Sequence, residues 1–228
     1  MEHVMEFFQK GGFVMYPLLL SSIVGLAIVI EKALSLRHKK VIIPEIVSVL
    51  DNIKGSGDIG LAMSICEKHK GPFANIIRIG LENRFLSREE IKETLNDSGR
   101  QEVHRLERGL VILETVANIA PLMGLLGTVT GILRVFNVIS TLGMGHASAM
   151  AGGISEALIT TIAGLFIGIP AVVGYNYFTS KAEDLILEIE KYSTLLLNKV
   201  VSFQVDDKNK ELQKELLLGE VEKHAVQS

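Results

Sequence analysis

Three long apolar runs interrupt an otherwise charged chain, and they constrain its fold more than any other feature. Residues 11–30 contain no charged side chain, and a run of this length is enough to cross a hydrocarbon core about 30 Å thick. Residues 111–140 and 154–178 are also mainly apolar. The mean hydropathy of +0.34 is typical of a membrane protein. We therefore expect an all-helical protein with three transmembrane helices.

Each apolar run also has an alternative interpretation. The first run could be a cleaved signal peptide, but Glu2 and Glu6 precede it, and Glu31 and Lys32 follow it where small residues would form a cleavage site. The second and third runs could be buried helices of a soluble core. The loop of small residues between them favours a membrane hairpin.

The distribution of lysine and arginine predicts the orientation of the spans. Residues 1–10 contain one such residue, 31–110 contain fourteen, 139–153 contain none and 179–228 contain seven. Loops rich in these residues stay in the cytoplasm, so 31–110 and 179–228 should be cytoplasmic and 1–10 and 139–153 periplasmic. All three spans agree with this one orientation. We predict a periplasmic N-terminus at 1–10, transmembrane helices at 11–30, 111–140 and 154–178, a cytoplasmic helical domain at 31–110, a periplasmic loop at 141–153 and a cytoplasmic helical tail at 179–228.

Part of the cytoplasmic region is expected to continue the second span. Ser87 and Glu90 form a capping-box pattern that opens a helix, and no proline follows before Pro121. The sequence therefore predicts a single helix from near Ser87 to about Ile139. The third span also continues helically, and two such extensions would form a cytoplasmic bundle.

Known catalytic and cofactor patterns are missing from the sequence. It contains no nucleotide-binding glycine loop and no paired-histidine zinc motif, and its six histidines are scattered. Cys66 is the only cysteine, so no disulfide forms within the chain. The net charge of −3 gives no electrostatic reason to bind nucleic acid. We expect no enzyme activity, no metal and no cofactor.

Small residues recur at heptad spacing along the second and third spans. In lipid, such stripes let helix backbones approach closely, so we expect helix–helix packing here. The packing could lie within one three-helix unit or between the subunits of a ring. Two small faces on so few spans favour the ring. The residues predicted to pack are Gly124, Gly127, Gly131, Gly164, Gly168 and Pro170, with Ala117, Ala120, Ala157, Thr161 and Ala171 in the same stripes.

Polar residues at membrane depth are the second signal. Glu156 lies just inside the third span beside Thr160 and Thr161, and Thr128 lies in the second. An ionisable group at such a depth costs roughly 2.5–3.5 kcal/mol on insertion scales and suggests function. In the alternative interpretation, the hydroxyls bond to carbonyls of their own helices, and Glu156 is an interfacial carboxylate that reaches water.

Two segments resemble a known family. APLMGLLGTVTGIL at residues 120–133 is similar to the second-helix signature of the MotA/TolQ/ExbB proton channel proteins. GISEALITTIAGLFIGIPAVVGYN at residues 153–176 is similar to their third-helix signature. The order, spacing and topology of the two segments also match, and within the ExbB/TolQ group the likeness is greatest to ExbB. The cytoplasmic region resembles the family only in its length and helicity.

The resemblance implies a subunit of a motor driven by the proton-motive force. Five copies would form a ring around single-span helices of an ExbD/TolR-like partner, in which an aspartate takes up and releases protons. Motion of the ring would act on a TonB- or TolA-like protein that reaches towards the outer membrane. By motif position, Thr128, Glu156 and Thr161 would line the ion route, with Thr160 beside them.

Two charged residues depart from the family pattern. Glu114 and Arg134 stand where uncharged residues are expected. Arg134 and Glu156 each lie a few residues from the outer ends of their spans, so they should have similar depths. Because opposite charges in a poorly hydrated site are more tolerable together than apart, we expect them to pair. The alternative is that Arg134 extends to lipid headgroups.

Two other functions are also compatible with parts of the sequence. A MotA-like stator subunit would need a fourth span, and a membrane scaffold without ion flux would use its polar residues only for packing. The sequence does not distinguish an ExbB from a TolQ role, or proton from sodium ion. It also leaves the roles of Glu114 and Arg134 undefined.

Overall fold

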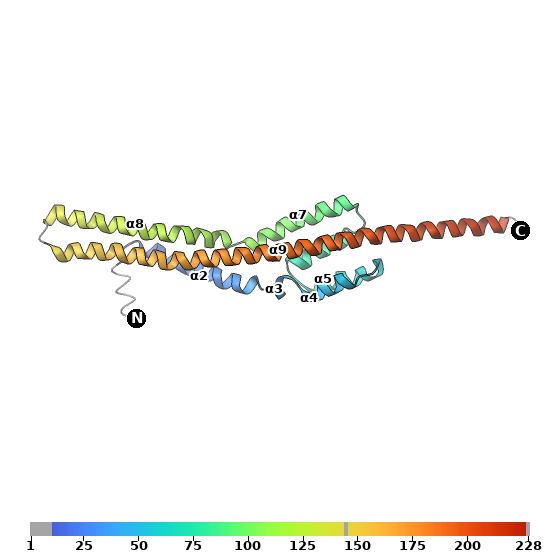
Figure 1. Cartoon of the computed structure of the whole chain (residues 1–228), viewed down its shortest axis with the longest axis horizontal. Helices are drawn as coiled ribbons and strands as arrows, with labels where there is room; N and C mark the ends of the chain where they lie inside the picture. The colour runs from blue at the N-terminus through green and yellow to red at the C-terminus, as the bar shows by residue number, and fades with distance from the viewer. Residues whose placement is uncertain (1–10, 144–145, 227–228) are drawn as a thin grey trace. The chain divides into compact units, whose positions relative to one another are not determined.

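A computed structural model of the chain describes residues 11–143 and 146–226, with side chains described to residue 216 and at Leu218. The predicted periplasmic N-terminus at 1–10 lies outside the described residues. The described part is all-helical and contains no β-strand, as the sequence predicted (Figure 1). In chain order the helices are α2 (Met15–Ser35), α3 (His38–Val41), α4 (Pro44–Asn52), a 3-10 turn (Ser56–Asp58), α5 (Ile59–Lys68), α6 (Pro72–Glu82), α7 (Arg88–Glu107), α8 (Leu110–Leu142) and α9 (Ala147–Val226).

Three of these helices are long and apolar enough to cross a membrane, namely α2, α8 and the part of α9 within Ala147–Leu216. The chain is therefore a multi-pass membrane protein, as predicted. The first helix begins later than the apolar run, because residues 11–14 form a turn in which Gly12 has a φ of +68°. Helix α9 begins at Ala147, so much of the segment 141–153 that was predicted to be a loop is helical.

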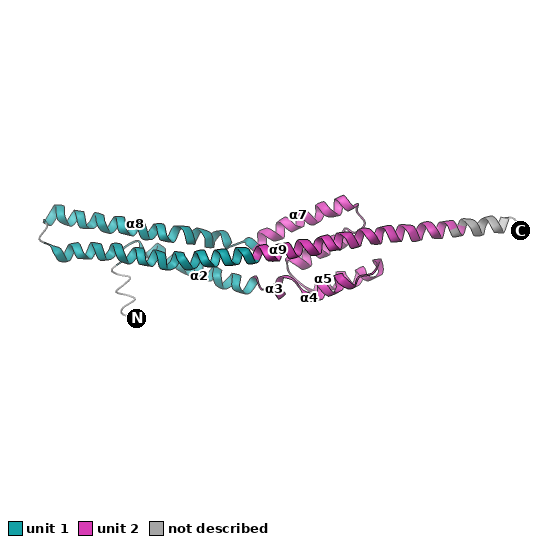
Figure 2. Ribbon diagram, viewed as in Figure 1, with its two compact units in different colours: residues 1–35, 107–181 teal, residues 36–106, 182–228 magenta. Residues whose placement is uncertain are grey.

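The chain divides into two compact units (Figure 2). Unit 1 comprises residues 1–35 and 107–181 and contains the three candidate spans up to residue 181. Unit 2 comprises residues 36–106 and 182–228 and contains helices α3 to α6 and α7 up to residue 106. Helix α9 contributes to both units, so one continuous helix carries the membrane signature and part of the second unit.

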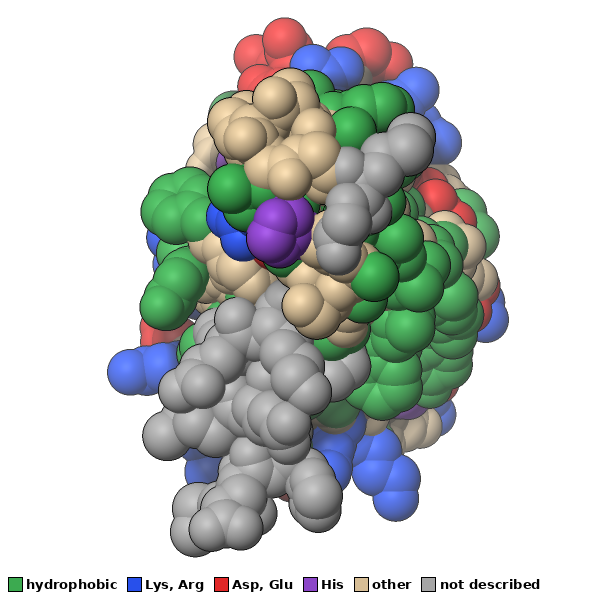
Figure 3. Space-filling model, turned by 90° about the vertical axis from the view of Figure 1, so that its left-hand side faces the viewer, with side chains coloured by type: hydrophobic (Ala, Val, Ile, Leu, Met, Phe, Trp, Pro, Cys, Tyr) green, Lys and Arg blue, Asp and Glu red, His purple; other side chains and the backbone are tan. Residues whose placement is uncertain are grey.

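Unit 1 has an apolar core and, in addition, many large apolar residues on its surface. Its core packs Val14, Met15 and Leu18 of the N-terminal segment against Ala120 of α8. Many leucine, isoleucine and phenylalanine side chains of α2, α8 and α9 are exposed. Figure 3 faces the turn between α8 and α9 and shows hydrophobic side chains covering one flank of the molecule. Lipid is the natural solvent for such a surface, so the exposed apolar residues support the membrane assignment.

Unit 2 is a small helical bundle with an apolar core of its own. Phe73 of α6 is completely buried, and its ring lies 5.4 Å from that of Tyr192 on α9. Lys199 of α9 donates hydrogen bonds to the carbonyl oxygens of Leu50, at 2.6 Å, and Asp51, at 2.8 Å. These carbonyls lie in the last turn of α4, where helix carbonyls have no partner within the helix. The contacts hold α4 against α9.

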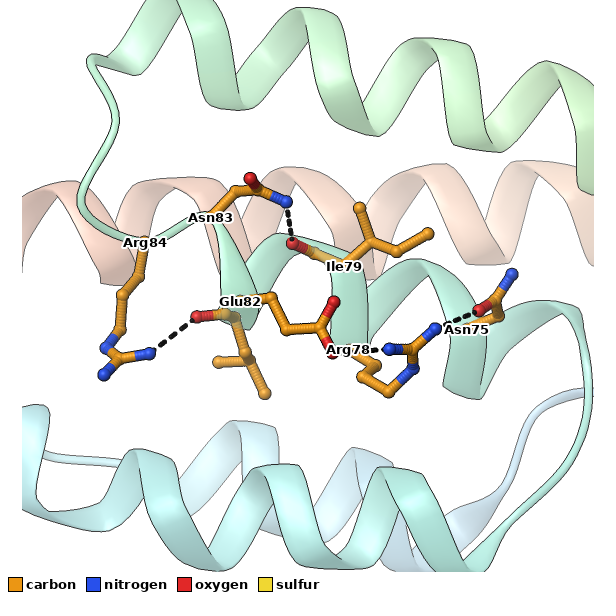
Figure 4. A network of polar contacts seen from close by, with 7 residues as sticks. Asn75, Arg78, Ile79, Glu82, Asn83 and Arg84 are labelled. Atoms are coloured by element: carbon orange, nitrogen blue, oxygen red, sulfur yellow. Dashed lines mark hydrogen bonds and ion pairs between the residues drawn. The ribbon is translucent and has the colours of Figure 1, made fainter.

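The exposed side of α6 carries local polar contacts (Figure 4). Arg78 donates to Glu82 one turn later, and its second nitrogen lies 3.0 Å from the amide oxygen of Asn75. Asn83 and Arg84 donate to backbone carbonyls of the last turn of α6. Pairs at these spacings stabilise a helix by about 0.2–0.5 kcal/mol each, so they support α6 locally. They do not suggest a binding site.

The predicted capping box at Ser87 is confirmed. The hydroxyl of Ser87 donates to Glu90 Oε2 at 2.8 Å, and its backbone N–H donates to the same oxygen at 2.9 Å. These two donors lower the pKa of Glu90. The helix that starts here is α7, so the start of this helix was predicted correctly.

The predicted single helix from Ser87 to Ile139 is wrong. Helix α7 ends at Glu107 and α8 begins at Leu110. The residue before α8 is Gly109, which has a φ of +91°. This left-handed conformation is available to glycine without the steric strain that a side chain would add. The chain therefore leaves the helical path at Gly109.

Candidate functional site

Helices α8 and α9 pack through the two stripes of small residues. A methyl group at Gly124 would lie 3.0 Å from the carbonyl oxygen of Thr160, and one at Gly164 would lie 2.6 Å from that of Ala120. A methyl group at Gly127 would lie 2.1 Å from the Thr160 hydroxyl oxygen. Only glycine leaves room for such close approach, so within one chain the stripes face each other.

The same contact extends to both ends of the stripes. At Gly131, an added methyl group would lie 2.7 Å from the carbonyl oxygen of Gly153, and at Gly168 it would lie 2.6 Å from the ring of Pro121. Pro170, which was grouped with these residues, is exposed. Packing within one three-helix unit therefore accounts for the glycine stripes.

The three candidate threonines all donate to carbonyls. Thr128 Oγ1 lies 2.6 Å from the carbonyl oxygen of Leu125. Thr160 is completely buried and donates to the carbonyl of Glu156 at 3.0 Å. Thr161 donates to Ala157 at 3.2 Å and, across the helix contact, to Gly124 at 3.3 Å. A hydroxyl that donates in this way still has lone pairs with which to accept a hydrogen bond or bind a cation.

Thr128 and Thr161 lie on the same edge of the α8–α9 pair. Thr161 bonds to Gly124, whereas Thr160 lies against Gly127. One residue turns an α-helix by about 100°. Around the axis of α8, Gly127 is therefore rotated about 60° from Gly124 in one direction. Thr128 is rotated about 40° from Gly124 in the opposite direction. Thr128 thus points to the side of Thr161 and away from Thr160.

Glu156 is buried and paired. Its residue is 7% exposed, and Arg134 Nη1 donates to its Oε2. The Arg134 side chain is 63% exposed. The two residues line a cavity of about 510 Å³ near the start of α9, together with Ala149, Ala151, Gly152, Gly153 and Ser155. The guanidinium therefore joins a buried carboxylate to an open cavity.

The turn before α2 closes over the other oxygen of Glu156. A methyl group at Gly12 would lie 1.9 Å from Glu156 Oε1. Gly12 also has a φ of +68°, so a side chain there would be strained for two reasons. Gly12 was not among the residues predicted from the sequence. The adjacent glycines 11 and 12 before the apolar run were the available signal.

The predicted ion-route residues therefore fall into two groups. Glu156 and Thr160 are about 40° apart on α9, whereas Glu156 and Thr161 are about 140° apart. Glu156 faces Arg134 and the turn at Gly12, and Thr161 faces the edge that carries Thr128. No group of three or more histidine, cysteine, aspartate or glutamate side chains could hold a metal ion in the part of the chain that the structure describes.

The sequence profile of the MotA/TolQ/ExbB proton channel family matches residues 68–191, which is more than half of the chain. The match includes the whole α8–α9 contact and both groups of polar residues. The chain belongs to the MotA/TolQ/ExbB proton channel family. This confirms the resemblance seen in the two sequence segments.

Curated relatives support the same assignment. A putative ExbB homolog for biopolymer transport from Methanothermobacter thermautotrophicus is 32% identical over 82% of this chain and 67% of the relative. An ExbB-like protein from Synechocystis is 35% identical over 78% of this chain and 71% of its own length. TolQ of the Tol-Pal system in Pseudomonas aeruginosa is 44% identical, over 38% of this chain and 37% of TolQ.

Family membership determines the broad class of function. The chain is a membrane transport protein of the ExbB/TolQ type and not an enzyme. Glu114 and Arg134 are the two charges that were expected to depart from the family pattern. The structure pairs Arg134 with Glu156, and Glu114 lies partly buried on α8.

Proposed function

We propose that this chain is a subunit of an ion-driven motor of the ExbB/TolQ type. Five copies would form a ring around an ExbD/TolR-like single-span protein, and the proton-motive force would drive motion of ring against partner. The motion would act on a TonB- or TolA-like protein that serves outer-membrane transport or integrity. The proposed location is the bacterial inner membrane, with the N-terminus in the periplasm and the C-terminus in the cytoplasm.

One structural observation supports this function most strongly. Within the part of the chain that matches the family, two glycine-packed helices carry the hydroxyls of Thr128 and Thr161 on one edge. Both hydroxyls donate to helix carbonyls, so each keeps lone pairs with which it can accept a hydrogen bond. We propose that this edge faces the ion route, with Thr160 and Glu156 contributing from the buried side.

The chemistry of the edge explains why a partner is needed. A hydroxyl can accept a hydrogen bond from a carboxylic acid or from water, but it does not carry charge near pH 7. Glu156 already accepts from Arg134. The group that binds and releases the driving proton would therefore be a carboxylate of the partner helix, solvated by the threonines as it passes.

Replacement of Thr161 by valine tests this proposal. The change keeps the shape of the side chain and removes the hydroxyl, so the complex should assemble with native mass. Ion flux through the complex reconstituted into liposomes should fall by at least about tenfold. This is the effect of losing roughly 1.4 kcal/mol of stabilisation at the rate-limiting step. Thr115→Val is the matched control, because that exposed hydroxyl bonds to the Val111 carbonyl on another side of α8.

The result also separates the alternative functions. Full activity in Thr161→Val would remove the hydroxyl from the ion route. A wild-type complex that carries neither protons nor sodium ions would favour a membrane scaffold. A MotA-like stator is less consistent with the three candidate spans of the described chain, because that role would need a fourth.

A further inference from the structure

The edge that carries Thr128 and Thr161 also carries a carboxylate. Glu114, Pro121 and Thr128 are spaced by seven residues on α8. Residues at this spacing stay on one side of a helix, with a drift of only about 20° per heptad. Glu114 therefore lies on the Thr128 side of α8, about 21 Å further along the helix at 1.5 Å per residue.

The contact between α8 and α9 extends this edge to both helices. Thr161 bonds to Gly124, one turn from Thr128, and the ring of Pro121 packs against Gly168. The two helices are antiparallel, and Pro121 of α8 lies against Gly168 of α9. Seven residues before Pro121 on α8 is Glu114, and seven residues after Gly168 on α9 is Tyr175. Glu114 and Tyr175 therefore lie at the same level of the helix pair. Tyr175 follows Gly168 by seven residues, as Gly168 follows Thr161. The level one heptad beyond the contact of Pro121 with Gly168 thus carries two polar residues, Glu114 and Tyr175.

The two carboxylates of the α8–α9 spans differ in their surroundings. Glu156 is buried, accepts from Arg134 and is covered by the turn at Gly12. Glu114 is only partly buried, and no hydrogen bond or ion pair joins it to another residue in the part of the chain that the structure describes. A carboxylate without a counter-charge in an apolar span is costly to keep unless it serves a function.

We propose that Glu114 is the inner cation-binding group of the ion route. An ion that leaves the threonine level would bind to the Glu114 carboxylate and then pass to water at the inner end of α8. For a proton, the carboxylate becomes a carboxylic acid on binding and a carboxylate again on release. For sodium, it acts as a counter-charge. Glu156, which is held by Arg134 on the buried side, would contribute to the route only indirectly. This inference rests on the proposed function.

Ion flux through the native complex, purified with its partner and reconstituted into liposomes, tests the inference. A potassium gradient with valinomycin would drive uptake, followed with a pH dye for protons and with labelled sodium in a separate arm. We expect Glu114→Gln to reduce flux by at least about tenfold. Glu114→Asp should restore much of it, because the shorter side chain keeps the carboxylate. A residue needed only for packing would show no such rescue.

Matched variants make the outcomes distinguishable. Glu93→Gln removes an exposed carboxylate of α7 and should leave flux unchanged, while the mass of every complex reports assembly. If Thr161→Val loses flux but an assembled Glu114→Gln complex keeps it, the role of Glu114 is overturned and the proposed function stands. Equal loss in the Gln and Asp variants would also overturn it. Absence of both proton and sodium flux in the wild type would remove the proposed function and this inference together.

Discussion

Among single residues, Glu156 shows how the fold tolerates a charge at membrane depth. A carboxylate transferred out of water needs a partner and hydrogen bonds, or it destabilises the folded state. Arg134 supplies the partner from the neighbouring helix, and its exposed stem and head reach the cavity at the start of α9. The pair therefore combines a buried acceptor with a hydrated donor, which makes the buried charge tolerable.

Replacement of Arg134 by alanine should destabilise the protein. The change leaves a buried carboxylate oxygen without its donor, a loss of about 1–3 kcal/mol. Thermal unfolding of the detergent-solubilised protein would show a lower midpoint than for Arg100→Ala, which removes an exposed arginine of α7. Exchange of the two charges, Arg134→Glu with Glu156→Arg, should recover part of the loss. A wild-type midpoint in Arg134→Ala would show that the pair adds nothing to stability.

Some of these residues could be predicted from the sequence, and others could not. The antiparallel order of the second and third spans was enough to place Arg134 and Glu156 at similar depth. The side of the helix pair on which each threonine lies depends on which glycine opposes it, and that register comes only from three-dimensional packing. The contact of Gly12 with Glu156 joins segments 144 residues apart in the sequence, so no local pattern contains it.

For the helices, too, features set by local sequence were predicted and others were not. The start of α7 was predicted from Ser87 and Glu90, because a capping box is a local arrangement. The end of α7 was not predicted, because a single glycine inside a helical pattern is often tolerated. Gly109 follows the basic residues Arg105 and Arg108, a combination typical of a helix C-terminus. That combination was the signal that could have located the break.

Replacement of Gly127 by leucine tests the packing of α8 on α9. The new side chain would collide with Thr160, whose hydroxyl oxygen lies 2.1 Å from the position of the first added carbon. Overpacking of this kind destabilises by about 1–3 kcal/mol, and the helices should separate. Gly152→Leu is the matched control, since a methyl group at Gly152 meets no atom within 4 Å. Thermal midpoint and complex mass would be measured for both, and a native Gly127→Leu complex would contradict the packing.

At the scale of the whole molecule, the chain combines an apolar unit with a water-facing unit. The apolar surface of unit 1 has no covering within the described chain, whereas unit 2 buries Phe73 and Leu196 in a core of its own. Composition predicted this division, because long uncharged runs and charged stretches alternate in the sequence. Copy number and partners depend on surfaces between chains, and a single sequence does not contain them.

The orientation of the molecule can be tested with the chain's single cysteine removed. Cys66 is 3% exposed, and burial raises its pKa to about 11. Because the reactive form is the thiolate, this thiol should react slowly with maleimides near pH 7, and Cys66→Ala removes the remaining background. In that variant, a new cysteine would be placed at Ser148 near the start of α9 or at Asn209 in its later part, both of which are exposed.

The lysine and arginine counts predict opposite sides of the membrane for these two positions. A membrane-impermeant maleimide should label Ser148→Cys in intact spheroplasts and Asn209→Cys only in inverted vesicles. Detergent-opened membranes, in which both positions should react, are the control for access. Label at Asn209→Cys in intact spheroplasts would reverse the orientation. It would also move Glu114 to the outer end of α8, and the ion route would then be entered, rather than left, at that carboxylate.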